Sequence, residues 1–146
     1  MPENIHSRVL QIRVGALVEV IGNVLSRVCM VSDILAARSD RVLSEWSRTA
    51  LVRQYTDLRD EINTLLMEKT VLYAKIDAEH SLGRITADNV IVIKELGALA
   101  GGAAEDTVSL IGTVTECMQA VDGSPFANSR LTTALVAVLD VVSKWR

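Results

Sequence analysis

Residues 10–35 read LQIRVGALVEVIGNVLSRVCMVSDIL, and the apolar residues of this stretch recur at alternating steps of four and three. The mean period of 3.5 residues keeps an apolar line facing a partner helix as two helices wind around each other. The line consists of Leu10, Val14, Leu17, Ile21, Val24, Val28, Val31 and Leu35. The stretch therefore predicts a long helix, at about residues 4–37, that packs lengthwise on another helix.

A second heptad line follows in a more highly charged segment, at about residues 40–80. Its apolar members are Leu51, Tyr55, Leu58, Ile62, Leu65, Leu72 and Ile76, and its one polar member is Lys69. A polar member of this kind can fix the register or the oligomeric state of packed helices. Arg38-Ser39-Asp40 offers capping residues but no glycine or proline, so we favour a turn there and leave one continuous helix open.

A third helix is predicted at about residues 87–121. Its heptad line runs through Ile93, Leu96, Ala100, Ala103, Thr107, Leu110, Val114, Cys117 and Val121. Residues 97–104 read GALAGGAA, and two adjacent glycines in a helix cost roughly 1 kcal/mol each relative to alanine. Gly101 and Gly102 therefore indicate either a close approach of a neighbouring helix or a kink, and we favour the close approach.

A shorter fourth helix is predicted at about residues 129–145, after the turn sequence Asp122-Gly123-Ser124-Pro125. The only other proline is Pro2, so the interior of the chain lacks the strongest helix breaker. Together these patterns predict an all-α fold with one domain over residues 1–146. We expect an elongated antiparallel helical bundle, or coiled-coil hairpin, of three long helices and one shorter C-terminal helix.

The composition excludes several functions. The chain has 146 residues, 15 basic and 18 acidic side chains, and only 3% aromatic residues. A nucleic-acid-binding protein is not expected, because phosphate binding favours an excess of basic residues and single strands stack on aromatic rings. Cys29 and Cys117 lie on apolar helical faces, which favours small buried side chains in a reducing compartment.

The N-terminal segment lacks the features of a secretory signal. Glu19 interrupts the apolar run and no small-residue cleavage site follows. No stretch of 18 residues is both apolar and free of charge, so we predict no transmembrane span and a cytoplasmic location. Secretion by a signal-independent route is left open.

The sharpest enzyme hypothesis rests on the two histidines, in the patterns Glu3-x-x-His6 and Asp77-x-x-His80. Residues three apart share a helix face, as do the ligands of carboxylate-bridged di-metal bundles, and an antiparallel hairpin would bring both pairs to one end. Such sites need two further carboxylates and a glutamate in place of Asp77, so we favour surface histidines. Neither a nucleophile constellation nor a phosphate-binding loop is present. We therefore expect that the protein is not an enzyme and that it binds no metal ion or other cofactor.

The leading functional hypothesis is a non-enzymatic helical interaction protein that acts through coiled-coil packing, as a self-assembling subunit, an adaptor or a chaperone-like partner. Its partner would be a second copy, most simply in a dimer, or another helical protein. The reason is that the first helix carries a second set of apolar residues, in addition to those that packing on a single neighbouring helix would bury. These residues are Val9, Ile12, Ala16 and Val20. The predicted interaction seam is Leu10, Val14, Leu17, Ile21, Val24 and Val28, with Leu51, Leu58, Ile62, Leu65 and Leu72.

The alternative is a membrane-active helical protein or effector whose C-terminal half engages a bilayer. The ending Lys144-Trp145-Arg146 places an amphipathic ring between cations, which suits a membrane interface, and the Gly/Ala segment resembles packing surfaces used in bilayers. Acidic residues such as Glu105, Asp106 and Glu116 interrupt that half, so this class ranks second. A di-metal carboxylate bundle ranks third.

Overall fold

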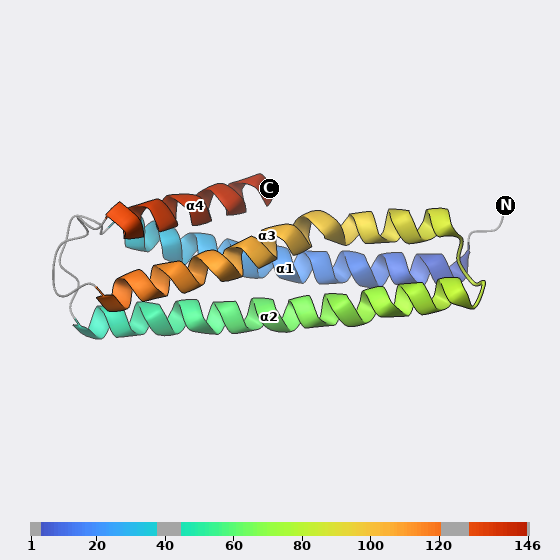
Figure 1. Cartoon of the computed structure of the whole chain (residues 1–146), viewed down its shortest axis with the longest axis horizontal. Helices are drawn as coiled ribbons and strands as arrows, with labels where there is room; N and C mark the ends of the chain where they lie inside the picture. The colour runs from blue at the N-terminus through green and yellow to red at the C-terminus, as the bar shows by residue number, and fades with distance from the viewer. Residues whose placement is uncertain (1–3, 38–44, 121–128, 146) are drawn as a thin grey trace.

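The computed structural model describes residues 4–37, 45–120 and 129–145, and within these ranges it contains four helices and no strand. The helices are α1 (Ile5–Ala37), α2 (Glu45–Ser81), α3 (Ala87–Ala120) and α4 (Ser129–Trp145). Successive helices run in opposite directions along one long axis (Figure 1). The predicted all-α antiparallel bundle of three long helices and one shorter helix is confirmed.

The predicted helix bounds agree with the structure to within one residue wherever both are described. The predicted start at residue 40 and end at residue 121 lie outside the described residues, as does the Arg38-Ser39-Asp40 segment. Because α1 and α2 run antiparallel, they are two helices and not one continuous helix (Figure 1).

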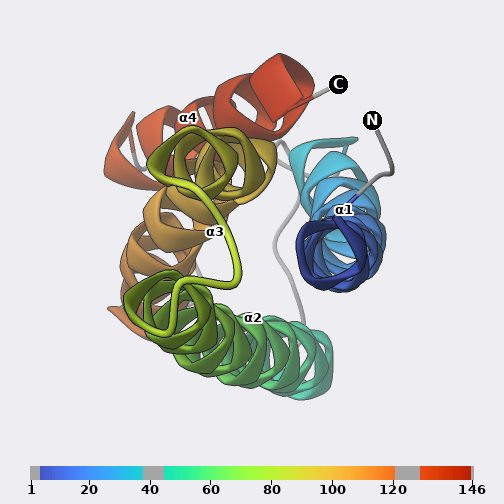
Figure 2. The same cartoon turned by 90° about the vertical axis from the view of Figure 1, so that its right-hand side faces the viewer.

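The bundle has a different number of helices at its two ends. α1, α2 and α3 contact one another, whereas α4 contacts α1 and α3 but not α2 among the described residues. α4 covers one half of the bundle and stops near its middle (Figure 1), and seen along the bundle it lies beside α3 and α1, away from α2 (Figure 2). The half that holds the start of α1 and the turn between α2 and α3 is therefore a three-helix bundle. The other half has four helices.

Most of the predicted seam forms the core of the chain itself. Ten of its eleven residues are buried, and Leu17 is half-buried. The buried apolar side chains form a large cluster that includes residues of α4 and a smaller one built on Leu10, Val14, Leu72, Ile76, Ile85 and Ile93. The seam therefore packs α1 and α2 within one chain, and contacts with a partner need other residues.

The heptad line predicted for α3 fails at two positions, where the buried residue is the next one along the chain. Leu96 is exposed and Leu110 is half-buried, whereas Gly97 and Ile111 are buried. The other predicted members are buried: Ile93, Ala100, Ala103, Thr107, Val114 and Cys117. Ala104 and Met118 are buried beside them, and Val121 lies outside the described residues. From hydrophobicity alone, leucine is expected to be buried in preference to glycine. At residue 97, however, the neighbouring helix leaves room only for the smaller residue.

Two glycines of α3 allow α2 to approach closely. A Cβ atom on Gly97 would lie 2.6 Å from the hydroxyl oxygen of Tyr73, and one on Gly101 would meet the side chain of Lys69. Gly102 is exposed and has no atom within 4 Å of its Cβ position. Close approach is thus the role of Gly101. In Figure 1 α3 also changes direction near its middle, while remaining one helix from Ala87 to Ala120.

This difference predicts opposite effects of alanine at two glycines. Gly97→Ala should lower the free energy of unfolding by about 1–3 kcal/mol, as overpacking does, because Tyr73 must move and its hydroxyl donates a 2.7 Å hydrogen bond to the Lys94 carbonyl oxygen. Gly102→Ala should raise it by about 1 kcal/mol, the gain in helix propensity at an exposed site. Urea unfolding of both variants measures the contrast, and effects of the same sign would contradict this packing.

Candidate interaction groove between α1 and α2

A groove runs along the bundle between α1 and α2. It consists of three adjoining cavities of about 890, 560 and 420 Å³. The first two share Val20, Thr64 and Leu65, and the second and third share Arg27, Asp57 and Glu61. The shared lining makes the three cavities one continuous feature, which we call the α1–α2 groove.

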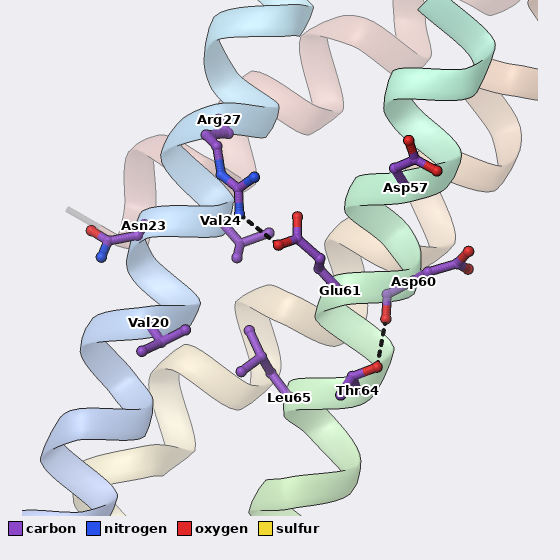
Figure 3. Close-up of a pocket in the computed structure, with 9 residues that line it drawn as sticks. All are labelled: Val20, Asn23, Val24, Arg27, Asp57, Asp60, Glu61, Thr64 and Leu65. Atoms are coloured by element: carbon purple, nitrogen blue, oxygen red, sulfur yellow. Dashed lines mark hydrogen bonds and ion pairs between the residues drawn. The ribbon is translucent and has the colours of Figure 1, made fainter.

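The middle of the groove has an apolar floor and a polar bridge above it. Val20 and Val24 of α1 and Leu65 of α2 point into the space between the helices (Figure 3). Arg27 donates a 2.9 Å hydrogen bond to Glu61 across the opening. Both side chains are about half exposed, and an exposed ion pair contributes only about 0–1 kcal/mol. The bridge therefore adds little to the stability of the bundle and does not close the apolar floor.

A second line of α1 residues, spaced at helical steps of three and four, faces away from the core beside the groove. We call it the outer stripe: Ile5, Val9, Ile12, Ala16, Val20, Asn23, Arg27, Met30 and Ile34. Every member is exposed, and seven of the nine are apolar. Single exposed apolar residues are common on protein surfaces, but a contiguous apolar patch marks a contact. The surplus set predicted from the sequence, Val9, Ile12, Ala16 and Val20, is thus part of this stripe.

The α2 side of the groove contributes residues that the sequence patterns did not single out. Met67 and Val71 are exposed and line the same cavity as Ala16 and Val20. They could not be recognised beforehand, because only the register between α1 and α2 brings them beside the outer stripe. Met30 and Ile34 were also missed. The 3-4 spacing does extend to them, but the polar Asn23 and Arg27 interrupt it.

The two walls of the groove carry opposite charges. The α1 wall contributes Arg13 and Arg27, and the α2 wall contributes Asp57, Asp60, Glu61 and Glu68. Glu61 is paired with Arg27, whereas the carboxylates of Asp57 and Asp60 have no ion-pair partner among the described residues. A partner that fills this groove would therefore present apolar side chains in its centre and cations toward α2.

His6, in the first turn of α1, lies against the end of α2. His6 Nδ1 is 3.5 Å from Glu79 Oε2, and the Arg84 guanidinium lies 3.1 Å from the other oxygen of the same carboxylate. Asn4 caps α1 by accepting hydrogen bonds from the backbone of His6 and Ser7, and it also donates one to the Arg84 carbonyl. These contacts join the helix ends.

The other residues of the metal hypothesis do not converge with His6. Asp77 pairs with Lys94 at 2.7 Å, and His80 Nδ1 lies 3.0 Å from the carbonyl oxygen of Ile85. Glu3 lies outside the described residues. His6 and His80 are at the same end of the bundle, as expected, but the carboxylate beside His6 is Glu79. Within the described residues no three histidine, cysteine, aspartate or glutamate side chains form a group that could hold a metal ion.

Alanine substitution of the histidines should therefore have little effect. His6→Ala removes the contact of a half-exposed imidazole with Glu79, and His80→Ala removes one hydrogen bond to a carbonyl; each is worth about 1 kcal/mol. We expect helix content and assembly to stay unchanged and the melting temperature to fall by only a few degrees. Circular dichroism melts and light scattering measure this. Loss of function with the fold intact would instead restore the metal or catalytic hypothesis.

Two buried polar features belong to the core and not to the groove. The Tyr55 hydroxyl donates a 3.0 Å hydrogen bond to Ser32 Oγ, and both side chains are fully buried. Burial raises the pKa of Tyr55 to about 12. Neither cysteine forms a disulfide. Cys117 is buried as expected, whereas Cys29 is half-buried, with its Sγ 3.8 Å from Asp33 Oδ2.

The apolar residues of the C-terminal half are divided between the core and the surface: Ile91, Val92, Leu96, Leu99 and Val136 are exposed. Leu131, Leu135, Val138 and Val142 of α4 are buried, as are Ala100 and Ala104 in the Gly/Ala segment. The side chain of Trp145 and all of Arg146 lie outside the described residues. By length and composition alone, α1 is the described helix that could cross a membrane, which is weak evidence because core helices and signal sequences pass the same test.

In comparisons with known proteins, no family model, no curated protein and no solved structure matches the chain. The groove, the outer stripe and their charges therefore carry the functional interpretation.

Proposed function

We propose that this chain is a non-enzymatic helical interaction protein that packs against a helical partner through the outer stripe and the α1–α2 groove. The observation that carries the proposal is the outer stripe of α1, which is apolar from Ile5 to Val20 and again at Met30 and Ile34. It spans about 44 Å at 1.5 Å per residue. An amphipathic helix laid into an apolar groove is a common recognition mode, anchored by residues three and four apart. The partner is a second copy of the chain or another helical protein.

The energetics favour such a contact. Full burial of one aliphatic side chain contributes roughly 1.5–3 kcal/mol, and Ile5, Ile12, Met30, Met67 and Val71 are each more than half exposed. Partial burial of several of them would offset the roughly 4–15 kcal/mol of translational and rotational freedom lost on association. The core seam cannot supply this surface, because it is already covered within the chain.

Membrane binding is the second candidate. The sequence patterns that suggest it lie in the C-terminal half, but the apolar surface that supports it most is on α1. α1 is apolar on its core side and on its outer stripe, so the stripe could lie on a bilayer instead of on a protein. Co-sedimentation with anionic vesicles at neutral and acidic pH tests it. Binding that is lost in Val20→Glu would support the membrane candidate, and no binding at either pH would exclude it.

Hydroxyl-radical footprinting tests the interaction proposal. Met30 and Met67 on the groove are 64% and 70% exposed, and Leu99 and Val136 on α3 and α4 are 63% and 61% exposed. The two methionines should be labelled several-fold more slowly in the native extract, or in concentrated purified protein, than at nanomolar concentration. Leu99 and Val136 serve as matched controls and should not change. Methionine labelling that is the same in all three samples would contradict the proposed function.

A further inference from the structure

We propose that the occupant of the α1–α2 groove is a second copy of the chain, related to the first by a two-fold axis that runs along the bundle. In this dimer α1 of each protomer packs on α2 of the other. The assignment rests on the proposed function and names its partner. It follows from the way in which charge and apolar surface are divided between the two walls of the groove.

A two-fold axis parallel to the helices keeps every residue at its own height and exchanges the two walls. The outer stripe of one protomer then faces the part of the partner's α2 that lies at the same height. Because α1 and α2 line shared cavities, those heights can be read from the lining: Arg27 lies level with Asp57 and Asp60, and Ala16 lies level with Met67 and Val71. We can therefore compare, at each height along the bundle, the α1 residues of one protomer with the α2 residues of the other.

The charges match in this arrangement. Arg27 of one protomer would face the acidic α2 wall of the other at the height of Asp57 and Asp60, whose carboxylates have no ion-pair partner among the described residues. The guanidinium already contacts Glu61 through one nitrogen, and its remaining N–H groups can donate to a second carboxylate. Because of the two-fold symmetry, this contact between Arg27 and the acidic wall occurs twice in the dimer.

The apolar surfaces match as well. Toward the start of α1, the outer stripe carries its uninterrupted apolar part, from Ile5 to Val20. The facing half of α2 exposes Met67, Val71, Ala74 and Ala78. Apolar surface thus meets apolar surface in the three-helix half of the bundle, and cation meets carboxylate in the four-helix half.

The other two-fold arrangement of the same faces is less favourable. An axis perpendicular to the helices would lay α1 antiparallel on α1 of the partner. Centred on Val20, it would bring Arg13 of one protomer opposite Arg27 of the other, because both lie seven residues from Val20. Like charges facing each other across an interface are destabilising. The charge pattern therefore favours the axis along the bundle over this centred antiparallel arrangement.

The available area suffices for a stable dimer. A stripe of about 44 Å on a face two helices wide, about 20 Å, gives about 900 Å² on each protomer. Specific protein–protein interfaces bury about 800 Å² per partner. The exposed apolar and charged residues described above extend along most of that length.

Charge reversal tests the arrangement. Sedimentation velocity of the full chain at micromolar concentration should give twice the mass of one chain. Arg27→Glu should weaken the dimer by about tenfold or more, as should Asp57→Lys combined with Asp60→Lys, because each places like charges across the interface. An equimolar mixture of the two variants should recover the dimer, since both charge contacts of the heterodimer are then attractive. Arg84→Glu is the matched control, because Arg84 is exposed to the same degree as Arg27 and also paired with a glutamate; it should remain dimeric.

The opposite outcomes are distinct. A tighter dimer with Arg27→Glu would indicate the perpendicular axis and overturn this assignment, as would failure of the mixture to dimerise while circular dichroism shows both variants folded. A wild-type chain that stays monomeric at high micromolar concentration also overturns it. If Met30 and Met67 are nevertheless protected in the native extract, the groove holds another protein and the proposed function stands. If they are not protected there either, both fail.

Discussion

Replacing Leu58 by aspartate is expected to unfold the protein at room temperature. Leu58 is 6% exposed and belongs to the large core cluster. Removing a buried leucine side chain costs about 2–5 kcal/mol by itself, and the aspartate adds an unpaired charge that is not solvated. Against a total stability of about 5–15 kcal/mol, the sum removes most or all of the folded population. Far-ultraviolet circular dichroism should show loss of most of the helix signal.

Two further aspartate variants test whether the loss of stability depends on how deeply the replaced leucine is buried. Leu17 was predicted to be a seam residue of equal rank. Both leucines border the groove, but Leu17 is only half-buried, so an aspartate there can reach water, whereas Leu58 is buried. Leu17→Asp should therefore be destabilised but still folded. Leu99→Asp, at an exposed position of α3, should melt almost as the wild type does. A folded Leu58→Asp variant with a melting temperature close to that of Leu99→Asp would contradict the described core.

Alkaline pH should destabilise the protein through Tyr55. Burial raises the pKa of its hydroxyl from 10.0 to about 12 in the folded state. The unfolded state therefore loses this proton first, so the contribution of Tyr55 to stability is complete below pH 10 and declines as the pH rises toward 12. Two pKa units correspond to about 3 kcal/mol at most. Tyr73, whose pKa burial also raises, should add to the same trend.

Tyr55→Phe isolates this effect. Near neutral pH the variant should be less stable than the wild type by about 1 kcal/mol, because it lacks the hydrogen bond to Ser32. Near pH 12 the order should reverse, since phenylalanine has no proton to lose. Urea unfolding of both proteins at a series of pH values measures the crossover. Parallel stability curves for the two proteins across this range would show that Tyr55 is not held neutral by burial.

The fold could be predicted from the sequence because local signals agree with the global packing. The 3-4 spacing of α1 and α2 marks their buried faces, and the helix ends coincide with turn and capping residues. The predictions of burial fail at positions where the shape of a neighbouring helix determines which residue is buried. Leu96 is exposed because Gly97 takes its place against Tyr73, and Leu17 is half-buried because the groove opens beside it. Neither depends on the hydrophobicity of the residue itself.

The candidate site was only partly predictable. The surplus apolar set of α1 pointed to an interaction surface, but the α2 wall depends on which face of α2 borders α1, and therefore on register. The seam was assigned to partner contacts and proves to be the chain's own core. Likewise the antiparallel hairpin brings His6 to the end of α2, as expected, yet it meets Glu79 and not Asp77, which lies two residues earlier and pairs with Lys94.

The central claim, that the outer stripe is a contact between copies, is tested most directly by the concentration dependence of the melting temperature. Association of folded chains stabilises them by mass action, so the melting temperature of the wild type should rise with protein concentration. Val20→Glu should melt at the wild-type temperature in dilute solution and show no such rise, because Val20 is exposed within its own chain. A wild-type melting temperature that is constant from nanomolar to high micromolar concentration would contradict the claim.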